Sequence, residues 1–275
     1  MNQNRPVIVT TDGSAHSHRV IPHAALLASA LDAPLLLLEV HDASQPNGVR
    51  AESEAASTLA RLGIVGEILI EGPQPGEKTA QAILRVVTQR DAAALAIDSQ
   101  GHGALRHALH GSVALDVLKA ADLPLLVSGP SLDLPSSEAS TYRLVATSDG
   151  SRASEALLRA LGALDAGIEV LLLRVHEREP AGRDDAAAVQ KCQDELETAR
   201  QLLPASMSVQ TAVREIPRGA GVDTAIVEEA NKFGAHAIAM STHGHSARRH
   251  VVMGSVAMTL LGRSPLPLLL VRAEV

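Results

Sequence analysis

Two glycine-bracketed loops are the stretches of this sequence best suited to chemistry. Gly244 is followed by nine residues and then by Gly254-Ser255, and Gly101 is followed by nine residues and then by Gly111-Ser112. Glycines let the backbone approach a ligand closely, and the free N–H groups of a helix that begins at the second glycine form an anion site. The spacing therefore predicts a phosphate-binding loop.

An Asp-Gly-Ser turn also occurs twice, as Asp12-Gly13-Ser14 and as Asp149-Gly150-Ser151. Each turn directly follows the run expected to form the first strand of its half. Asp, Gly and Ser suffice for a tight turn and a helix cap, which is the alternative to a ligand role. The same placement in both halves favours a ligand role.

Basic and histidine side chains recur inside the nine-residue loops. Arg106-His107 and Arg249-His250 could neutralise phosphate charge or could be solvated loop residues, and both interpretations stay open. The histidine spacing is not a zinc signature, and no Cys or acidic ligand accompanies it at a defined interval. We predict no metal site from the loop histidines His102, His107, His110, His243, His245 and His250.

Several catalytic motifs are absent from the sequence. There is no G-x-S-x-G elbow, no Walker A motif, and no G-x-G-x-x-G after the first strand of either half. This pattern excludes the common serine hydrolase, P-loop and dinucleotide-binding classes. We predict no catalytic residue.

Composition limits the partners and the compartment. The net charge is −7, from 24 basic and 31 acidic side chains, which argues against generic nucleic-acid binding. Cys192 is the single cysteine, so no internal disulfide can form. No apolar run approaches the roughly 20 residues that span a bilayer, and no secretory signal opens the sequence. We expect a soluble cytoplasmic protein without a membrane partner.

The elements that position these loops follow from apolar runs and Gly/Pro punctuation. In the first half we expect strands at 7–11, 35–40, 65–70, 92–97 and 124–128, and helices at 20–31, 49–62, 79–88 and 112–121. In the second half we expect strands at 144–147, 169–175, 208–216, 235–240 and 266–271, with helices at 154–164, 184–203, 221–233 and from 255 onward.

The two halves repeat one order of elements, which indicates a tandem duplication. The predicted fold class is α/β, with two repeated doubly wound domains, each a five-stranded parallel sheet with four helices. The domains are expected at 1–128 and 142–275, joined by a Ser/Pro-rich linker at 129–141. Ligands of such sheets bind beyond the carboxyl ends of the strands at the topological switch point, where both candidate loops are expected.

Asp-Gly-Ser after a first strand, paired with Gly-x9-Gly-Ser after a fourth, resembles the universal stress protein family in its tandem two-domain form. The resemblance covers nearly the whole chain. The ATP-binding branch of that family resembles G-x2-G-x9-G-[S/T], whereas this sequence has Asp98 and Ser241 at the position of the first glycine.

The resemblance implies that ATP or a related adenine nucleotide, with Mg²⁺ as a companion ion, is the ligand. It implies that Asp12 and Asp149 face the nucleoside, that Val40 and Val175 offer backbone groups to the adenine, and that the glycine loops hold the phosphates. The implied site residues are Asp149, Val175, Met240, Ser241, Gly244, Arg249, Gly254, Ser255 and Val256 in the second half, and Asp12, Val40, Gly101, Gly111, Ser112 and Val113 in the first.

The two departures from the motif differ in their expected effect. Ser241 adds a small hydroxyl, whereas a carboxylate at Asp98 would oppose a nearby polyanion electrostatically. The C-terminal half is therefore predicted to be the better site. Mg²⁺ bridging Asp98 to a phosphate is the alternative.

Three functions remain open from the sequence. The first is a nucleotide-binding stress protein with at most slow ATP hydrolysis. The second is an interaction scaffold with degenerate sites, in which the strand edges at 123–127 and 266–271 pair the two halves as an intramolecular pseudo-dimer. Two such chains could in addition form a homodimer. The third is an adenylating enzyme, suggested by the resemblance of Ser148 to Ser151 to the Ser-Gly-Gly loop of nucleotide α-hydrolases. This function is ranked last because the resemblance is faint.

Overall fold

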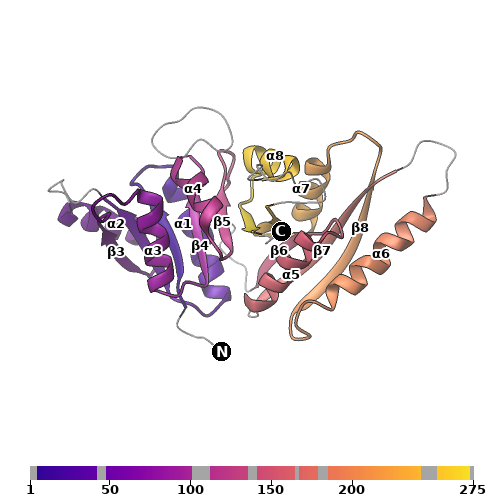
Figure 1. Cartoon of the computed structure of the whole chain (residues 1–275), viewed down its shortest axis with the longest axis horizontal. Helices are drawn as coiled ribbons and strands as arrows, with labels where there is room; N and C mark the ends of the chain where they lie inside the picture. The colour runs from indigo at the N-terminus through magenta and orange to yellow at the C-terminus, as the bar shows by residue number, and fades with distance from the viewer. Residues whose placement is uncertain are drawn as a thin grey trace.

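The computed structural model describes residues 5–41, 48–100, 112–135, 141–164, 167–178, 185–242 and 253–272. Strands and helices alternate along both halves (Figure 1). The first half contains β1 (Val7–Thr11), α1 (Ser17–Ala30), β2 (Leu35–Val40), α2 (Gly48–Leu62), β3 (Glu67–Glu71), α3 (Thr79–Gln89), β4 (Ala94–Asp98), α4 (Ser112–Ala120) and β5 (Leu125–Ser128).

The second half repeats this order. It contains β6 (Tyr142–Thr147), α5 (Arg152–Leu164), β7 (Ile168–Glu177), α6 (Ala186–Arg200), β8 (Ser208–Ile216), α7 (Val222–Phe233), β9 (Ala237–Ser241), α8 (Ser255–Arg263) and β10 (Leu268–Val271). The predicted α/β class is confirmed. No helix among the described residues is both long and apolar enough to cross a membrane.

The described strands form one sheet with the order β3-β2-β1-β4-β5-β10-β9-β6-β7-β8. Neighbouring strands within each half are parallel. In the first half, β2 and β3 follow on one side of β1, and β4 and β5 then lie on its other side. In the second half, β7 and β8 lie on one side of β6, and β9 and β10 lie on the other. The switch points therefore lie between β1 and β4 and between β6 and β9.

The two halves meet through antiparallel pairing of β5 with β10. Leu268 lies opposite Val127, Leu269 opposite Leu126, and Leu270 opposite Leu125. The pairing between halves that the sequence suggested is confirmed, and it joins the two predicted five-stranded sheets into one. Each half thereby covers a hydrophobic strand edge of the other.

Apolar clusters cover both faces of this sheet. One cluster contains residues of α1, α2, α5 and α6, and the other contains residues of α3, α4, α7 and α8. Each cluster draws side chains from both halves. Strands covered on both faces explain the continuous apolar runs in the sequence, such as Leu35–Val40.

Element ends differ from the predictions by a few residues, for local reasons. Helix α1 begins at Ser17, three residues early, because Ser14 Oγ accepts a hydrogen bond from Ser17 N at 3.2 Å. Helix α6 ends at Arg200 because the next bonds, such as Leu203 N to Arg200 O, span three residues, and Pro204 follows.

The described part of the segment predicted as a linker packs against both halves. Leu132 is 1% exposed, and Asp133 donates its N–H to Pro265 O at 2.9 Å. On the other side, His23 Nε2 of α1 lies 2.8 Å from Asp133 O. Composition predicts a break between repeats here, but the packing depends on tertiary contacts that composition cannot predict.

Candidate functional site

A pocket of about 300 Å³ opens at the carboxyl ends of the second-half strands. It lies at the switch point between β6 and β9, where doubly wound sheets bind ligands. Its volume is at the lower end of the range of small-molecule sites, about 300 to 1,000 Å³. The described lining residues are Thr147, Ser148, Asp149, Ser154, Leu173, Val175, Val222, Ile226, Met240, Ser241, Gly254, Ser255, Val256 and Ala257.

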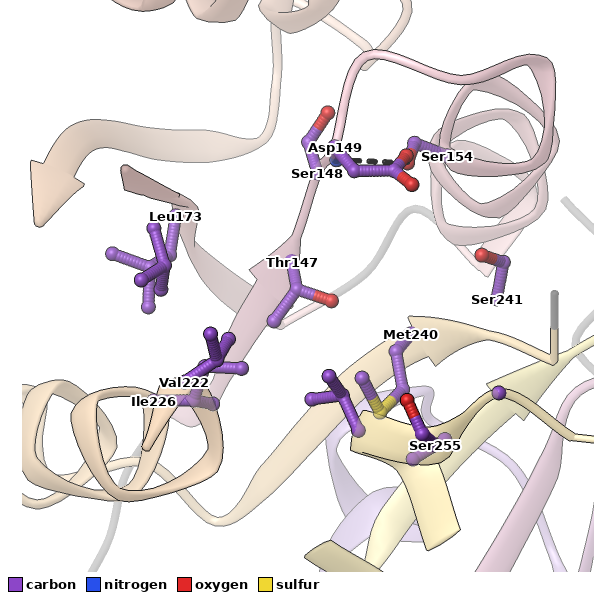
Figure 2. A pocket seen from close by; sticks show the side chains of 14 residues that line it. Thr147, Ser148, Asp149, Ser154, Leu173, Val222, Ile226, Met240, Ser241 and Ser255 are labelled. Carbon is purple, nitrogen blue, oxygen red and sulfur yellow. Dashed lines mark hydrogen bonds between the residues drawn. The ribbon is translucent and has the colours of Figure 1, made fainter. Parts of the chain in front are cut away.

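One wall of the pocket is apolar and the other is polar. Leu173, Val222 and Ile226 lie together on one side, and Asp149 and Ser154 face each other across from them (Figure 2). Leu173 comes from β7, and the other two apolar residues come from one turn of α7. Such a site can hold a ligand with a flat apolar part and a polar part.

The polar wall is the Asp-Gly-Ser turn after β6. Asp149 Oδ1 accepts hydrogen bonds from Ser151 N at 3.0 Å and from Ser154 Oγ at 2.6 Å. Ser151 Oγ accepts from Ser154 N at 3.2 Å and so caps α5. Gly150 has a φ of +76°, which glycine adopts without strain. The predicted turn and capping chemistry is present, and the same residues face the pocket.

The start of α8 forms a further side of the pocket. Gly254 is the N-cap residue and has no side chain to bond the first helical N–H groups, and its own N–H donates to Thr242 O at 2.9 Å. Ser255, Val256 and Ala257, which carry those first N–H groups, all line the pocket. The positive end of a helix dipole therefore faces the cavity, as an anion site requires.

The structure brings most of the predicted C-terminal site residues into this one cavity. Asp149, Val175 and Ser255 come from three different elements, and Met240, Ser241, Gly254 and Val256 line the same space. Gly244 and Arg249 lie outside the described residues.

Sequence analysis missed seven of the lining residues, which are Thr147, Ser148, Ser154, Leu173, Val222, Ile226 and Ala257. Two signals could have found some of them. Leu173 precedes Val175 by two residues and so shares its strand face, and Val222 and Ile226 are four apart on one helix face. The packing of α7 over the strand ends was not visible in the sequence.

The first half repeats the turn but differs at the end of β4. Asp12 Oδ1 accepts from Ser14 N at 3.0 Å, and Thr11 Oγ1 and Ser17 Oγ lie 2.9 Å apart. Asp12 follows β1, Val40 ends β2, and Val113 lies in the first turn of α4. Ser112 begins α4, and Gly101 and Gly111 lie outside the described residues.

Asp98 is the largest difference between the two switch points. Its carboxylate accepts hydrogen bonds from Ser128 Oγ at 2.6 Å and from Gln100 N at 2.7 Å. Burial raises the pKa of Asp98, while the bonds from Ser128 and Gln100 oppose that rise. Ser241 and Val271 occupy the equivalent paired positions in the second half, where no carboxylate stands.

Among the described residues, no group of three or more His, Cys, Asp or Glu side chains could hold a metal ion. The six loop histidines that we considered as metal ligands lie outside the described residues.

Comparison with protein families gives a match over almost the whole chain. The model described as the Universal stress protein family matches residues 3–70, 74–128 and 143–272. The comparison with curated proteins gave no match.

Solved structures similar to this chain include other universal stress proteins. One from Archaeoglobus fulgidus DSM 4304 has a TM-score of 0.61 at 17% identity, covering 98% of this chain and 96% of that chain. A putative one from Pseudomonas aeruginosa UCBPP-PA14 has a TM-score of 0.61 at 15% identity, covering 98% and 93%. At these identities, the similarity shows the shared fold.

A shorter structure matches about half of the chain. It is the universal stress protein from Archaeoglobus fulgidus in complex with dAMP, with a TM-score of 0.37 at 23% identity, covering 45% of this chain and 96% of that chain.

Proposed function

The chain belongs to the universal stress protein family, and we propose that it binds ATP or a related adenine nucleotide in the pocket of its second half and acts in the stress response. The observation that carries the proposal is the convergence of Asp149, Val175 and the start of α8 on one cavity. These are the three elements that the motif resemblance assigns to nucleoside, adenine and phosphates.

Each part of the pocket suits a part of the nucleotide. The apolar wall of Leu173, Val222 and Ile226 can hold the base, and the Asp149 turn can hold the sugar. The N–H groups at the start of α8 can bind phosphate oxygens. The described lining contains one carboxylate, Asp149, and no lysine or arginine. Arg249 and Mg²⁺ are therefore the proposed sources of positive charge.

The first half is proposed to be the weaker site or a silent one. The Asp98 carboxylate lies at the end of β4, where the phosphates would bind. Hydrogen bonds from Ser128 and Gln100 hold it in place. A fixed negative charge at close range opposes a polyanion.

In this proposal the protein is a cytoplasmic binding module and not a fast enzyme, because we assign no general base or nucleophile to the pocket. A measured ATP turnover in the ordinary enzyme range, about 1 per second or more, would contradict this part of the proposal.

Mass analysis of nucleotide released from the denatured, freshly purified protein tests the proposal. We expect about one adenine nucleotide per chain. A count near two would mean that Asp98 is tolerated. No released nucleotide, together with no calorimetric heat on adding MgATP to millimolar concentration, where binding is only about −4 kcal/mol, would reject nucleotide binding.

Two substitutions of one residue sharpen this test. A Cβ added at Gly254 would meet only Thr242 O, at 4.0 Å, so the backbone accepts a side chain. Asp and Asn are equally good N-cap residues, but only Asp places a negative charge at the proposed phosphate site. Gly254→Asp should abolish binding, whereas Gly254→Asn should retain more of it. Gly111→Asp is the matched change in the first half and should have little effect.

The β5–β10 pairing favours the interaction scaffold as a second candidate function. This pairing makes one continuous sheet from two repeats, which a duplicated scaffold requires whether or not a nucleotide binds. Because the two repeats lie end to end in this sheet, we also propose the domain division at 1–128 and 142–275. In this second candidate function, a homodimer would form through surfaces other than the β5–β10 pairing.

A further inference from the structure

The first half has a second cleft, of about 410 Å³, on the sheet face opposite the one that bears the nucleotide pocket of the second half. It lies between β2, the turn before α1, and α2. Leu37 at its base belongs to the apolar cluster under α1 and α2, whereas Leu173 of the nucleotide pocket belongs to the other cluster. Its polar lining residues are Thr11, His18, Glu39, Glu54, Ser57, Thr58 and Arg61.

Strand register shows which second-half residue corresponds to Glu39. Thr10 pairs with Leu38 in the first half, and Thr147 pairs with Leu173 in the second, so Glu39 corresponds to Arg174. Both side chains reach the glycine of their own Asp-Gly-Ser turn. A Cβ added at Gly13 would lie 3.9 Å from Glu39 Oε1, and one added at Gly150 would lie 2.9 Å from Arg174 Nη1.

Helix packing gives the second correspondence. Buried residues four apart occur in both helices, Ala55 and Leu59 in α2 and Cys192 and Leu196 in α6, and both leucines belong to one cluster. This pattern aligns Thr58 with Glu195. In the second half, Arg174 Nη1 lies 3.5 Å from Glu195 Oε2. The chain's own guanidinium thus occupies the space between strand, helix and turn.

The first half presents the complementary groups without that guanidinium. The Glu39 side chain is 10% exposed, and its ion pair among the described residues is with His41. Thr58 is 6% exposed, and no hydrogen bond joins its hydroxyl to another described residue. Of the other ionisable side chains in the lining, Glu54 pairs with Arg50, and Arg61 is exposed. Burial and the nearby Arg61 charge lower the pKa of His18. The carboxylate of Glu39 and the hydroxyl of Thr58, both on largely buried residues, therefore line an open cleft.

We propose that this cleft binds a small organic cation whose guanidinium group takes the place that Arg174 has in the second half. A planar guanidinium can donate two parallel N–H bonds to the Glu39 carboxylate and a further bond to Thr58 Oγ1. The site lies on the other sheet face and in the other half from the proposed nucleotide pocket, so the two proposals stand or fall separately.

Titration of the full chain with agmatine, followed by calorimetry and by ¹H–¹⁵N chemical shifts, tests the proposal. We expect saturable binding, with shifts centred on β2 and α2. Glu39→Gln, which keeps a hydrogen-bonding group beside His41, should weaken binding at least tenfold. Glu52→Gln is the matched control, because Glu52 is an exposed residue of α2 outside the cleft lining, and it should leave binding unchanged.

Two further variants keep the test decisive if Glu39→Gln disturbs the fold. Thr58→Val preserves the side-chain shape and should weaken agmatine binding, and Glu39→Arg should abolish it by filling the cleft as Arg174 does. The proposal is overturned if wild type gives no saturable binding up to 10 mM agmatine, a concentration about ten times the Kd of a 1 mM site. Equal binding by wild type and both Glu39→Gln and Thr58→Val would also overturn it. Binding of a capped Gly-Arg-Gly peptide without agmatine binding would overturn the small-molecule assignment.

Discussion

At the scale of single residues, the duplication preserves a turn and changes what surrounds it. Gly13 and Gly150 have φ values of +77° and +76°, so both turns need glycine for the same backbone reason. Their neighbours differ, since Gly13 faces a carboxylate and Gly150 a guanidinium. Paired substitutions in the two halves can therefore separate backbone strain from side-chain crowding.

We expect Gly13→Ala and Gly150→Ala each to cost about 1 kcal/mol of unfolding free energy from the left-handed backbone. Gly150→Ala should cost more, because its Cβ would lie 2.9 Å from Arg174 Nη1 and would push that side chain away from Glu195. Urea denaturation of both variants measures the difference. Equal losses would show that Arg174 relaxes without penalty.

His23 should make the stability of the protein depend on pH. Its side chain is buried, its Nε2 bonds Asp133 O, and burial lowers its pKa from 6.5 to about 4. Between those two values the unfolded chain binds more protons than the folded one, so stability rises with pH through this window and is complete above it. The His23 contribution lost below the window is about 3 kcal/mol.

Urea denaturation at pH 5 and pH 7 checks this prediction, with His23→Gln as the comparison. The glutamine amide can still donate to Asp133 O but does not titrate. The variant should lose much of the pH dependence of the wild type, leaving the part due to His18 and His236, whose pKa values burial also lowers. An unchanged slope in the variant would assign the pH dependence to other groups.

Asp98 is the residue expected to silence the first-half site. Asp98→Ser creates the residue present at the equivalent position 241, removes the fixed charge and leaves a group that can still bond Ser128. We expect released nucleotide to rise from about one to about two per chain. Asp122→Ser is the control, because Asp122 has an exposed side chain and lies outside both switch points. A count that stays at one would mean that another first-half residue blocks the site.

At the scale of elements, close contact between β5 and α8 helps to hold the halves together. A Cβ added at Gly129, just after β5, would lie 1.7 Å from the backbone oxygen of Leu261 in α8. Because that atom belongs to the backbone, Gly129→Ala must move one element. We expect a loss of about 3 kcal/mol or more, at the upper end of single substitutions. Gly254→Ala, where the nearest atom is 4.0 Å away, should cost about 1 kcal/mol in the same urea assay.

The elements were largely predictable because the local signals in this chain agree with one another. Strand β8 lies at the predicted residues, and the glycine and proline positions mark most other ends. The pocket was predictable only where a motif named its residues, as at Asp149 and Gly254. The α7 wall at Val222 and Ile226 was missed because no motif marks a helix that closes over strand ends. The correspondence of Val40 with Val175 already aligns Glu39 with Arg174 in the sequence, but only the structure shows that both side chains reach the glycine of their turn.

At the scale of the whole molecule, the repeats share one sheet and both apolar clusters. Leu126 of the first half and Leu269 of the second are fully buried neighbours in β5 and β10, and both belong to the same cluster. Unfolding one half alone would expose this strand edge and the leucines on it to water. Burial of apolar surface stabilises folding by about 25 cal/mol per Å², so separate unfolding of either half is costly.

We therefore expect a single cooperative calorimetric transition for the wild-type chain, although two repeats of this size could unfold separately. The calorimetric and van't Hoff enthalpies should agree, as they do for two-state unfolding. Gly129→Ala should weaken the junction selectively and broaden or split the transition, whereas Gly150→Ala should lower its midpoint without splitting it. Two resolved transitions in the wild type would mean that the β5–β10 junction couples the halves less strongly than their cores stabilise them. In that case, the second-half pocket should survive melting of the first half, and nucleotide should raise the midpoint of one transition only.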